Sequence, residues 1–282
     1  MRLVGYLEGG TQRFGMLEDG EVREIRDAVS IAGVAAELGD MRSRLGPPQA
    51  VGSLAMAAPV APLVRNIFCV GWNYPAHFEE GKSSRALGSV QEIPERPAFF
   101  TKATGTLIGP NDPISAHRAV TETLDWEVEL AVVLARGGRD ISEASAVDHV
   151  LGYAVANDIS ARNVQREHGG QWFRGKSLDA TCPIGPWIVT PDEVGDLDGL
   201  EIACRVNGER VQSARLGDMH FGVPHIIAEL SRGLTLFPGD VILTGTPPGV
   251  GFARTPPRYL AVGDVVESEI AGIGILRNEI ID

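Results

Sequence analysis

The segment TETLDWEVELAVVL, residues 121–134, constrains the fold more than any other part of the sequence. Side chains on a strand alternate between faces, so Asp125, Glu127 and Glu129 would share one face. Residues 131–134 are apolar on both faces, which is typical of a strand buried on both sides. The sequence therefore predicts a strand that enters a core while carrying acidic side chains on one face.

Glu127 and Glu129 are unusual residues for such a strand. Residues two apart lie roughly 6.5–7 Å apart along a strand, so both carboxylates would suffer desolvation and mutual repulsion. A divalent cation offsets both penalties, and hard oxygen ligands suit Mg²⁺, Mn²⁺ or Ca²⁺. The alternative is an edge strand whose acidic face lies in water.

Asp158 is a good candidate for a third acidic ligand. It ends an apolar run, residues 150–158, after which the chain becomes polar. Segments that follow strand ends often carry function. The alternative is that Asp158 caps the N-terminus of a following helix. The two roles compete only in part, so both stay open.

His77 and Glu80 form a candidate acid–base pair. They are three residues apart and would face each other on one helical turn. A carboxylate beside an imidazole fixes its tautomer and raises its basicity, which suits a general base for water. The alternative is an ordinary pair on a helix surface.

Lys176 lies in a polar, glycine-bearing connection, residues 165–177. A lone lysine is usually a solvated surface charge. Beside a metal and an anionic substrate it would instead hold a carboxylate or stabilise an enolate. The residues alone leave both roles open.

Six motifs in this chain resemble those of the fumarylacetoacetate hydrolase family, in particular its smaller, prokaryote-type branch. They occur in family order and cover roughly residues 65–280. The motifs are GWNYPAHFEE at 71–80, FFTKATGTLIGPNDPI at 99–114, DWEVELAVVL at 125–134, GYAVANDISARNVQ at 152–165, RGKSLDATCPIGPW at 174–187 and FPGDVILTGTPPGVG at 237–251.

The resemblance implies roles for ten residues. Three would bind one Mg²⁺ or Mn²⁺, with Ca²⁺ also compatible: Glu127, Glu129 and Asp158. Three would be catalytic: the pair His77 and Glu80, carried on a lid, and Lys176. Four would contact substrate: Arg162, Gln165, Thr246 and Lys102.

Two features of the implied lid stand out. Trp72 and Phe78 are bulkier than the residues usual at these positions of the family, and would narrow or reshape the pocket. The segment from about Glu79 to Glu95 is charged and lacks apolar periodicity. We therefore expect it to be mobile without ligand.

The expected fold is mainly β with some α. The resemblance implies a mixed β-sandwich roll with peripheral helices, usually assembled as a homodimer. Residues 1–25 predict strands at 3–7, 14–17 and 22–25, with a turn at Asp19-Gly20. A helix-compatible stretch ending at Gly46-Pro47-Pro48 completes a small N-terminal α+β piece. The proline-broken segment 57–63 predicts a boundary between a domain at 1–60 and a catalytic domain at 61–282.

The implied reaction is cleavage of a 2,4-dioxo acid, an acylpyruvate such as fumarylpyruvate, by a metal-dependent hydrolase. A 2-oxo acid can chelate the metal, which stabilises the enolate that leaves. The same chemistry serves a decarboxylase or isomerase of 2-oxo or 2-hydroxydienoic acids, with oxaloacetate as one example. A dehydratase of 2-oxo-3-deoxy sugar acids is a further alternative, and a scaffold that binds metal without catalysis is the least favoured.

Composition limits the partners. The formal net charge of −12 argues against nucleic acid and anionic membrane surfaces as partners. Apolar runs fall far short of the roughly 20 residues that span a bilayer, and the N-terminus lacks a secretory signal pattern. Three widely spaced cysteines suit free thiols in a reducing compartment. We therefore expect a cytoplasmic enzyme acting on a small acid.

Overall fold

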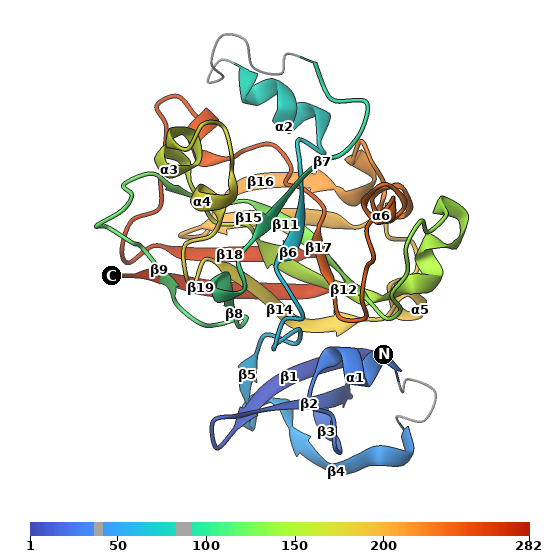
Figure 1. Cartoon of the computed structure of the whole chain (residues 1–282). Helices are drawn as coiled ribbons and strands as arrows, with labels where there is room; N and C mark the ends of the chain where they lie inside the picture. The colour runs from blue at the N-terminus through green and yellow to red at the C-terminus, as the bar shows by residue number, and fades with distance from the viewer. Residues whose placement is uncertain (37–41, 83–91) are drawn as a thin grey trace.

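One 12-stranded sheet runs through the protein and forms the frame of the fold (Figure 1). The computed structural model describes residues 1–36, 42–82 and 92–282. The main path of the sheet has the spatial order β4 (Leu45–Ala50), β3 (Glu21–Ile25), β2 (Thr11–Glu18), β1 (Arg2–Glu8), β14 (Cys182–Val189), β12 (Val150–Asn157), β11 (Val128–Leu134), β17 (Val241–Leu243), β6 (Ile67–Gly71) and β7 (Ala98–Lys102). Beside this path, β5 (Ala55–Ala57) pairs with β1 and β8 (Leu107–Ile108) pairs with β14.

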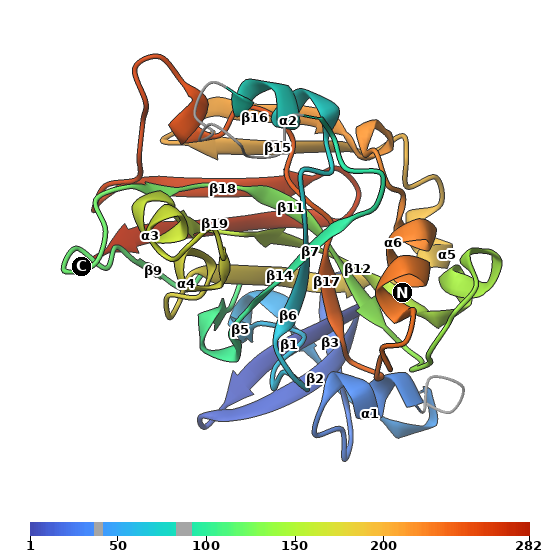
Figure 2. The same ribbon diagram turned by 45° about the horizontal axis from the view of Figure 1, so that its top comes forward.

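Two smaller sheets complete the β structure. A five-stranded sheet has the order β16 (Glu209–Arg215), β15 (Glu201–Val206), β18 (Val265–Ile270), β19 (Gly274–Ile281) and β9 (Ile114–Ser115). Figure 2 shows this sheet lying across the central strands of the large one. A two-stranded sheet pairs β10 (Leu124–Asp125) with β13 (Ser160–Ala161). The mainly β architecture with layered sheets confirms the predicted fold class.

The predicted strand at 125–134 is buried on both faces, as its apolar pattern indicates, but it is interrupted. It divides into β10 and β11, with Trp126 and Glu127 between them. Val128 and Leu130 belong to a core shared with the five-stranded sheet. Ala131 and Val133 face a second core, which includes the apolar side chains of the N-terminal strands.

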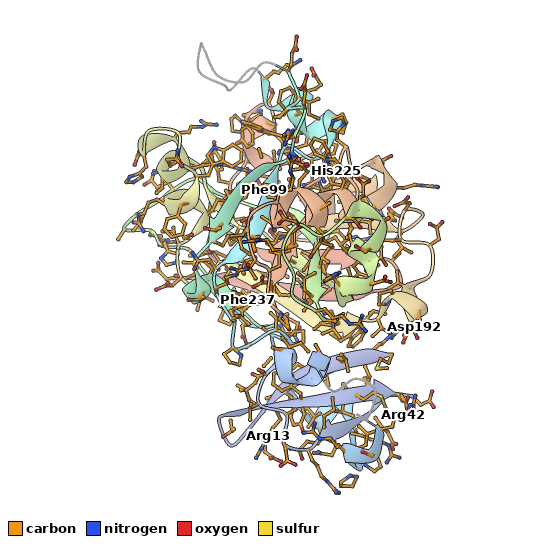
Figure 3. The ribbon with its side chains drawn as sticks, turned by 45° about the vertical axis from the view of Figure 1, so that its right-hand side comes forward. Arg13, Arg42, Phe99, Asp192, His225 and Phe237 are labelled. Atoms are coloured by element: carbon orange, nitrogen blue, oxygen red, sulfur yellow. The ribbon has the colours of Figure 1, made fainter. Side chains whose placement is uncertain are left out.

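The N-terminal strands form as predicted and occupy a lower layer of the molecule, which carries Arg13 and Arg42 (Figure 3). Asp19 and Gly20 both have positive φ, of 51° and 80°, as a tight two-residue hairpin turn requires. The predicted helix-compatible stretch does contain a helix, Ile31–Ala36, but its predicted end is wrong, because Gly46-Pro47-Pro48 lie in β4. Prolines are tolerated there because β4 is the edge strand of the sheet.

The proposed boundary at residue 60 does not interrupt the large sheet. β1 pairs with β14 through Arg2 opposite Val189 and Leu3 opposite Ile188. The division into residues 1–60 and 61–282 therefore stays a proposal about folding units.

The helices are short and lie around the sheets (Figure 1). They are α1 (Ile31–Ala36), α2 (Pro75–Glu80), α3 (Arg162–Glu167), α4 (Phe173–Lys176), α5 (Pro191–Val194) and α6 (Val223–Ser231). Among the described residues, none of these helices has the length and apolarity needed to cross a bilayer. Most of the segment expected to be mobile, residues 83–91, lies outside the described residues.

Two Gly-Asp turns precede β17 and β18 and provide a matched test of burial. Gly239 and Gly263 have positive φ of 83° and 91°. The fully buried Asp240 carboxylate accepts the Phe237 N–H at 2.7 Å and pairs with Arg65. The half-buried Asp264 carboxylate instead accepts the Ala261 N–H at 2.9 Å and the Asn207 amide at 2.7 Å.

We expect Asp240→Ala to lower the free energy of unfolding by about 2–4 kcal/mol, because it leaves the Phe237 N–H without its acceptor and removes the carboxylate partner of Arg65. Asp264→Ala is expected to cost less than about 1 kcal/mol, since water can replace the lost carboxylate there. Urea denaturation of the two variants measures the difference. Equal losses would show that burial of Asp240 does not govern its contribution.

Candidate active site

Antiparallel pairing of β11 with β12 assembles the three predicted acidic ligands. Val128 lies opposite Asn157, and the Asp158 N–H donates to the Glu127 carbonyl at 2.8 Å. Glu127, Glu129 and Asp158 are all buried, and one carboxylate oxygen from each lies within 4.8 Å of the others. The alternative of a solvent-facing edge strand is wrong, because β11 lies between β12 and β17.

Asp158 does not cap a helix. The next helix, α3, begins at Arg162 and has Ala161 at its N-cap position. The Asp158 carboxylate instead accepts hydrogen bonds from the Lys102 Nζ at 2.8 Å and the Lys176 Nζ at 2.6 Å. Asp158 therefore faces the cluster of charges and takes no part in helix capping.

Basic side chains neutralise part of this acidic cluster. The Lys176 Nζ lies 2.7 Å from the Glu127 Oε2, and an Arg162 guanidinium nitrogen lies 2.6 Å from the Glu127 Oε1. Burial raises the pKa of Glu127, but Lys176 and Arg162 outweigh that effect and bring it down to about 2. Lys176 is itself 2% exposed, so it is a buried counter-ion, and the surface alternative is wrong.

Glu129 differs from the other two carboxylates in its partners. Lys102, Lys176 and Arg162 direct their ion pairs to Asp125, Glu127 and Asp158. Glu129 receives the backbone N–H of Gly245 at 2.7 Å. Burial, together with the charges of Asp158 and Glu127, raises its pKa well above the ordinary value.

A divalent cation fits this arrangement. It would place a positive charge directly beside Glu129, which forms no ion pair within the described residues, and it would meet a set of oxygen donors only. Mg²⁺, Mn²⁺ and Ca²⁺ all favour such donors, so the ligands favour no single one of them.

The predicted acid–base pair is formed on α2. The His77 Nδ1 lies 2.8 Å from the Glu80 Oε1. The second oxygen of Glu80 accepts the backbone N–H of Gly249 at 2.8 Å. His77 is 8% exposed, so the pair does not decorate a helix surface. With Glu80 at Nδ1, the Nε2 of His77 is the atom left for proton transfer.

The four predicted substrate contacts differ in their surroundings. Arg162 donates to the Gln165 side-chain oxygen at 3.2 Å. The Thr246 hydroxyl donates to the Val128 carbonyl at 2.9 Å and accepts from the Gln212 amide at 2.8 Å. Lys102 is fully buried behind Asp158, and it also donates to the Ile159 carbonyl at 3.1 Å. Their roles toward a substrate stay predictions.

Aromatic side chains join α2 to α4, the helix that carries Lys176. The ring centroids of Trp72 lie 5.9 Å from Phe78 and 4.7 Å from Trp172. Phe100 lies 5.2 Å from Trp172, and its ring lies 5.1 Å from the Lys176 Nζ. The bulk of Trp72 and Phe78 therefore packs toward the lysine side of the site.

Sequence reasoning missed two contributors to the site. The sequence places Asp125 on the acidic face without a specific role, whereas in the structure its carboxylate accepts a hydrogen bond from the Arg162 Nε at 2.8 Å. Asn157 accepts the Glu127 N–H at 2.9 Å through its side chain. The acidic run DWEVE points to Asp125, whereas no local pattern points to Asn157.

Comparison with known proteins covers every residue of the candidate site. Residues 66–281 match the family model described as Fumarylacetoacetate (FAA) hydrolase C-terminal. The oxaloacetate tautomerase YisK of Bacillus subtilis (strain 168) is 44% identical over 230 residues, which are 82% of this chain and 74% of that protein.

Two solved structures extend the similarity to the whole chain. The fumarylacetoacetate hydrolase EaFAH of Exiguobacterium antarcticum is 38% identical, with a TM-score of 0.86 over 100% of this chain and 99% of that one. The 5-carboxymethyl-2-hydroxymuconate delta-isomerase of Mycobacterium smegmatis is 32% identical, with a TM-score of 0.79 and the same coverage.

Proposed function

The chain belongs to the fumarylacetoacetate hydrolase family, and on that premise we propose that it is a divalent-metal-dependent tautomerase of a small 2-oxo acid such as oxaloacetate. The observation that carries the proposal is the buried triad of Glu127, Glu129 and Asp158 with the Lys176 ammonium on two of its members. The similarity to an oxaloacetate tautomerase and to an isomerase supports this reaction class over hydrolysis. The sequence motifs favour acylpyruvate hydrolysis, with isomerisation among the alternatives, and the proposed function reverses that order.

Glu127, Glu129 and Asp158 would hold the metal. When bound there, a divalent cation supplies a Lewis acid for the carboxylate and carbonyl oxygens of a 2-oxo acid. Lys176 would offset the negative charge that develops on the substrate oxygen. Arg162, already paired with Glu127, would keep that carboxylate oriented and ionised.

His77 would move the proton. Its Nε2 takes the proton from the carbon next to the carbonyl, and the imidazolium that forms is stabilised by Glu80 at Nδ1. The imidazolium then gives this proton to the substrate oxygen, which completes the change from keto to enol and restores the neutral His77. No water enters this reaction and no carbon–carbon bond breaks.

The acylpyruvate hydrolase is the second candidate, because the His77–Glu80 pair is equally suited to deprotonating a water. Hydrolysis would release pyruvate and a second acid. Decarboxylation would release carbon dioxide, and dehydration of a sugar acid would release water without cleavage. The products therefore separate all four reactions.

With Mg²⁺ or Mn²⁺ present, we expect the enzyme to accelerate the loss of the ultraviolet absorbance of enol-oxaloacetate, without release of pyruvate. His77→Ala is expected to lower kcat by about 10²–10⁴-fold, because it removes the acid–base group. His149→Ala, at a half-buried histidine bound to the Arg136 carbonyl, is the matched control. Cleavage of an acylpyruvate with oxaloacetate left unchanged would make the hydrolase correct and the tautomerase wrong.

Three other expectations remain proposals. The partner is a small 2-oxo or 2,4-dioxo acid, in keeping with the cationic side chains at the triad. The assembly is a homodimer, and the location is the cytoplasm. Sedimentation analysis and cell fractionation test the last two.

A further inference from the structure

We propose that the loop Gly249–Phe252 is a positioning element that couples the His77–Glu80 pair to Glu127, and so links the acid–base pair to metal affinity. The proposal rests on the metal site of the proposed function and adds a coupling between its two halves. The loop follows β17 and binds two carboxylates through its backbone N–H groups.

The first end of the loop holds the acid–base pair. The Gly249 N–H donates to the Glu80 Oε2 at 2.8 Å, while the other oxygen of Glu80 binds His77. The carbonyl of Gly249 accepts from the indole nitrogen of Trp126 at 3.1 Å. Trp126 is fully buried, so this glycine is fixed from both sides.

The second end of the loop holds Asp125. The N–H groups of Gly251 and Phe252 donate to its carboxylate at 2.7 and 3.1 Å. Asp125 is fully buried and accepts from the Arg162 Nε at 2.8 Å. Arg162 then pairs with Glu127 at 2.6 Å. Consecutive polar contacts therefore run from the loop to a metal ligand.

The ring of Phe252 strengthens the second end. The Arg162 guanidinium carbon lies 4.5 Å from the ring centroid, a distance typical of cation–π contact. A guanidinium held by Asp125, Glu127 and an aromatic face has little freedom to rotate. The position of the loop therefore sets the position of Arg162.

Glycines allow the loop to approach both carboxylates. Gly249 has a φ of 108°, and a Cβ there would lie 2.1 Å from the Val211 carbonyl oxygen. A Cβ on Gly251 would lie 2.0 Å from the Arg258 carbonyl oxygen and 2.7 Å from the Asp125 Oδ1. Larger residues would push the N–H groups away from their acceptors.

The coupling is tested by a double-mutant cycle in the full chain, read by Mn²⁺ calorimetry. Glu80 is not one of the three proposed ligands, yet Glu80→Gln is expected to weaken Mn²⁺ binding by about 3–10-fold. A neutral amide holds the Gly249 N–H less strongly than a carboxylate does, so the loop, and with it Arg162 and Glu127, shifts. In the Asp125→Asn background, Glu80→Gln is expected to have no further effect. Glu79→Gln, at the exposed neighbour on α2, is the control and should leave affinity unchanged.

Hydrogen exchange read by mass spectrometry provides a second measurement. Asp125→Asn is expected to raise exchange across residues 249–252, including Gly249, whose acceptor Glu80 is intact. If Asp125→Asn does not fold, Phe252→Leu replaces it, because leucine keeps the N–H groups and removes only the ring from Arg162.

Two outcomes would overturn the coupling: unchanged Mn²⁺ affinity in Glu80→Gln, or effects of the two substitutions that simply add. Both measurements are made without turnover. Absence of keto–enol activity would therefore contradict the proposed reaction and leave the coupling intact. Additive effects on Mn²⁺ affinity would contradict the coupling and leave the proposed reaction intact.

Discussion

Replacing Glu129 with glutamine is expected to abolish metal-dependent activity and, at the same time, to stabilise the metal-free protein. Its pKa is raised by burial and by the charges of Asp158 and Glu127, so the ionised form is costly at neutral pH. Glutamine removes that charge and can still accept the Gly245 N–H. The melting temperature should rise by about 2–4 °C for each kcal/mol of repulsion removed.

The same change removes a proposed metal ligand. We expect Mn²⁺ affinity to fall by more than about 100-fold and activity to follow it. Calorimetry and thermal melts, each with and without Mn²⁺, measure the two effects. Glu279→Gln, at an exposed glutamate on β19, is the control for a general charge effect. Unchanged metal affinity in Glu129→Gln would refute the metal site.

Glu127→Gln provides the contrast, because the same chemical change at a neighbouring ligand should destabilise the protein. The pKa of Glu127 is lowered from 4.5 to about 2. Its charge therefore stabilises the fold above about pH 4.5, by about 3 kcal/mol, and that contribution is lost as the pH falls toward 2. Glu127→Gln should thus lower stability at pH 7 and make it less dependent on pH in the acid range.

Replacing Lys176 with methionine is expected to separate metal binding from catalysis. Its ammonium lies 2.7 Å from Glu127 and 2.6 Å from Asp158. A cation must share these oxygens with the lysine, so removing the charge should increase Mn²⁺ affinity by about 10-fold. The value of kcat should fall by about 10²–10³-fold, because developing charge on the substrate oxygen loses its counter-ion.

The metal-free Lys176→Met protein should also be less stable, by about 3–5 kcal/mol, since two buried carboxylates lose a partner. Added Mn²⁺ should restore most of that stability. Lys176→Arg keeps the charge and serves as the control for metal affinity. An enzyme that loses Lys176 but retains its kcat would show that the lysine is structural only.

Local patterns in the sequence were sufficient for the central strand and for the pair of glutamates in the triad. The apolar run of residues 131–134 predicts burial on both faces, and the structure confirms it. Two carboxylates so close to a buried run are costly without a cation, which is why the pair indicates a site. The spacing of His77 and Glu80 likewise predicts their contact, because one helical turn brings residues three apart together.

Partners far apart in the chain were decided only by the tertiary structure. Strand alternation predicts that Asp125 lies on the same face as Glu127. In the structure, however, its carboxylate binds the N–H of Gly251, which is 126 residues away. Glu80 binds Gly249 across 169 residues. The prolines of β4 fit because that strand is the edge of the sheet, which local sequence does not reveal.

Sequence by itself therefore determined which residues are candidates for the chemistry, because periodicity and short spacing act within a strand or a helical turn. Tertiary structure alone decided how these residues are held: Lys102 behind Asp158, Arg162 between Asp125 and Glu127, and the glycine loop against Glu80. Such contacts depend on sheet order and on close backbone approach. Both are set by packing of the whole chain, which no local segment encodes.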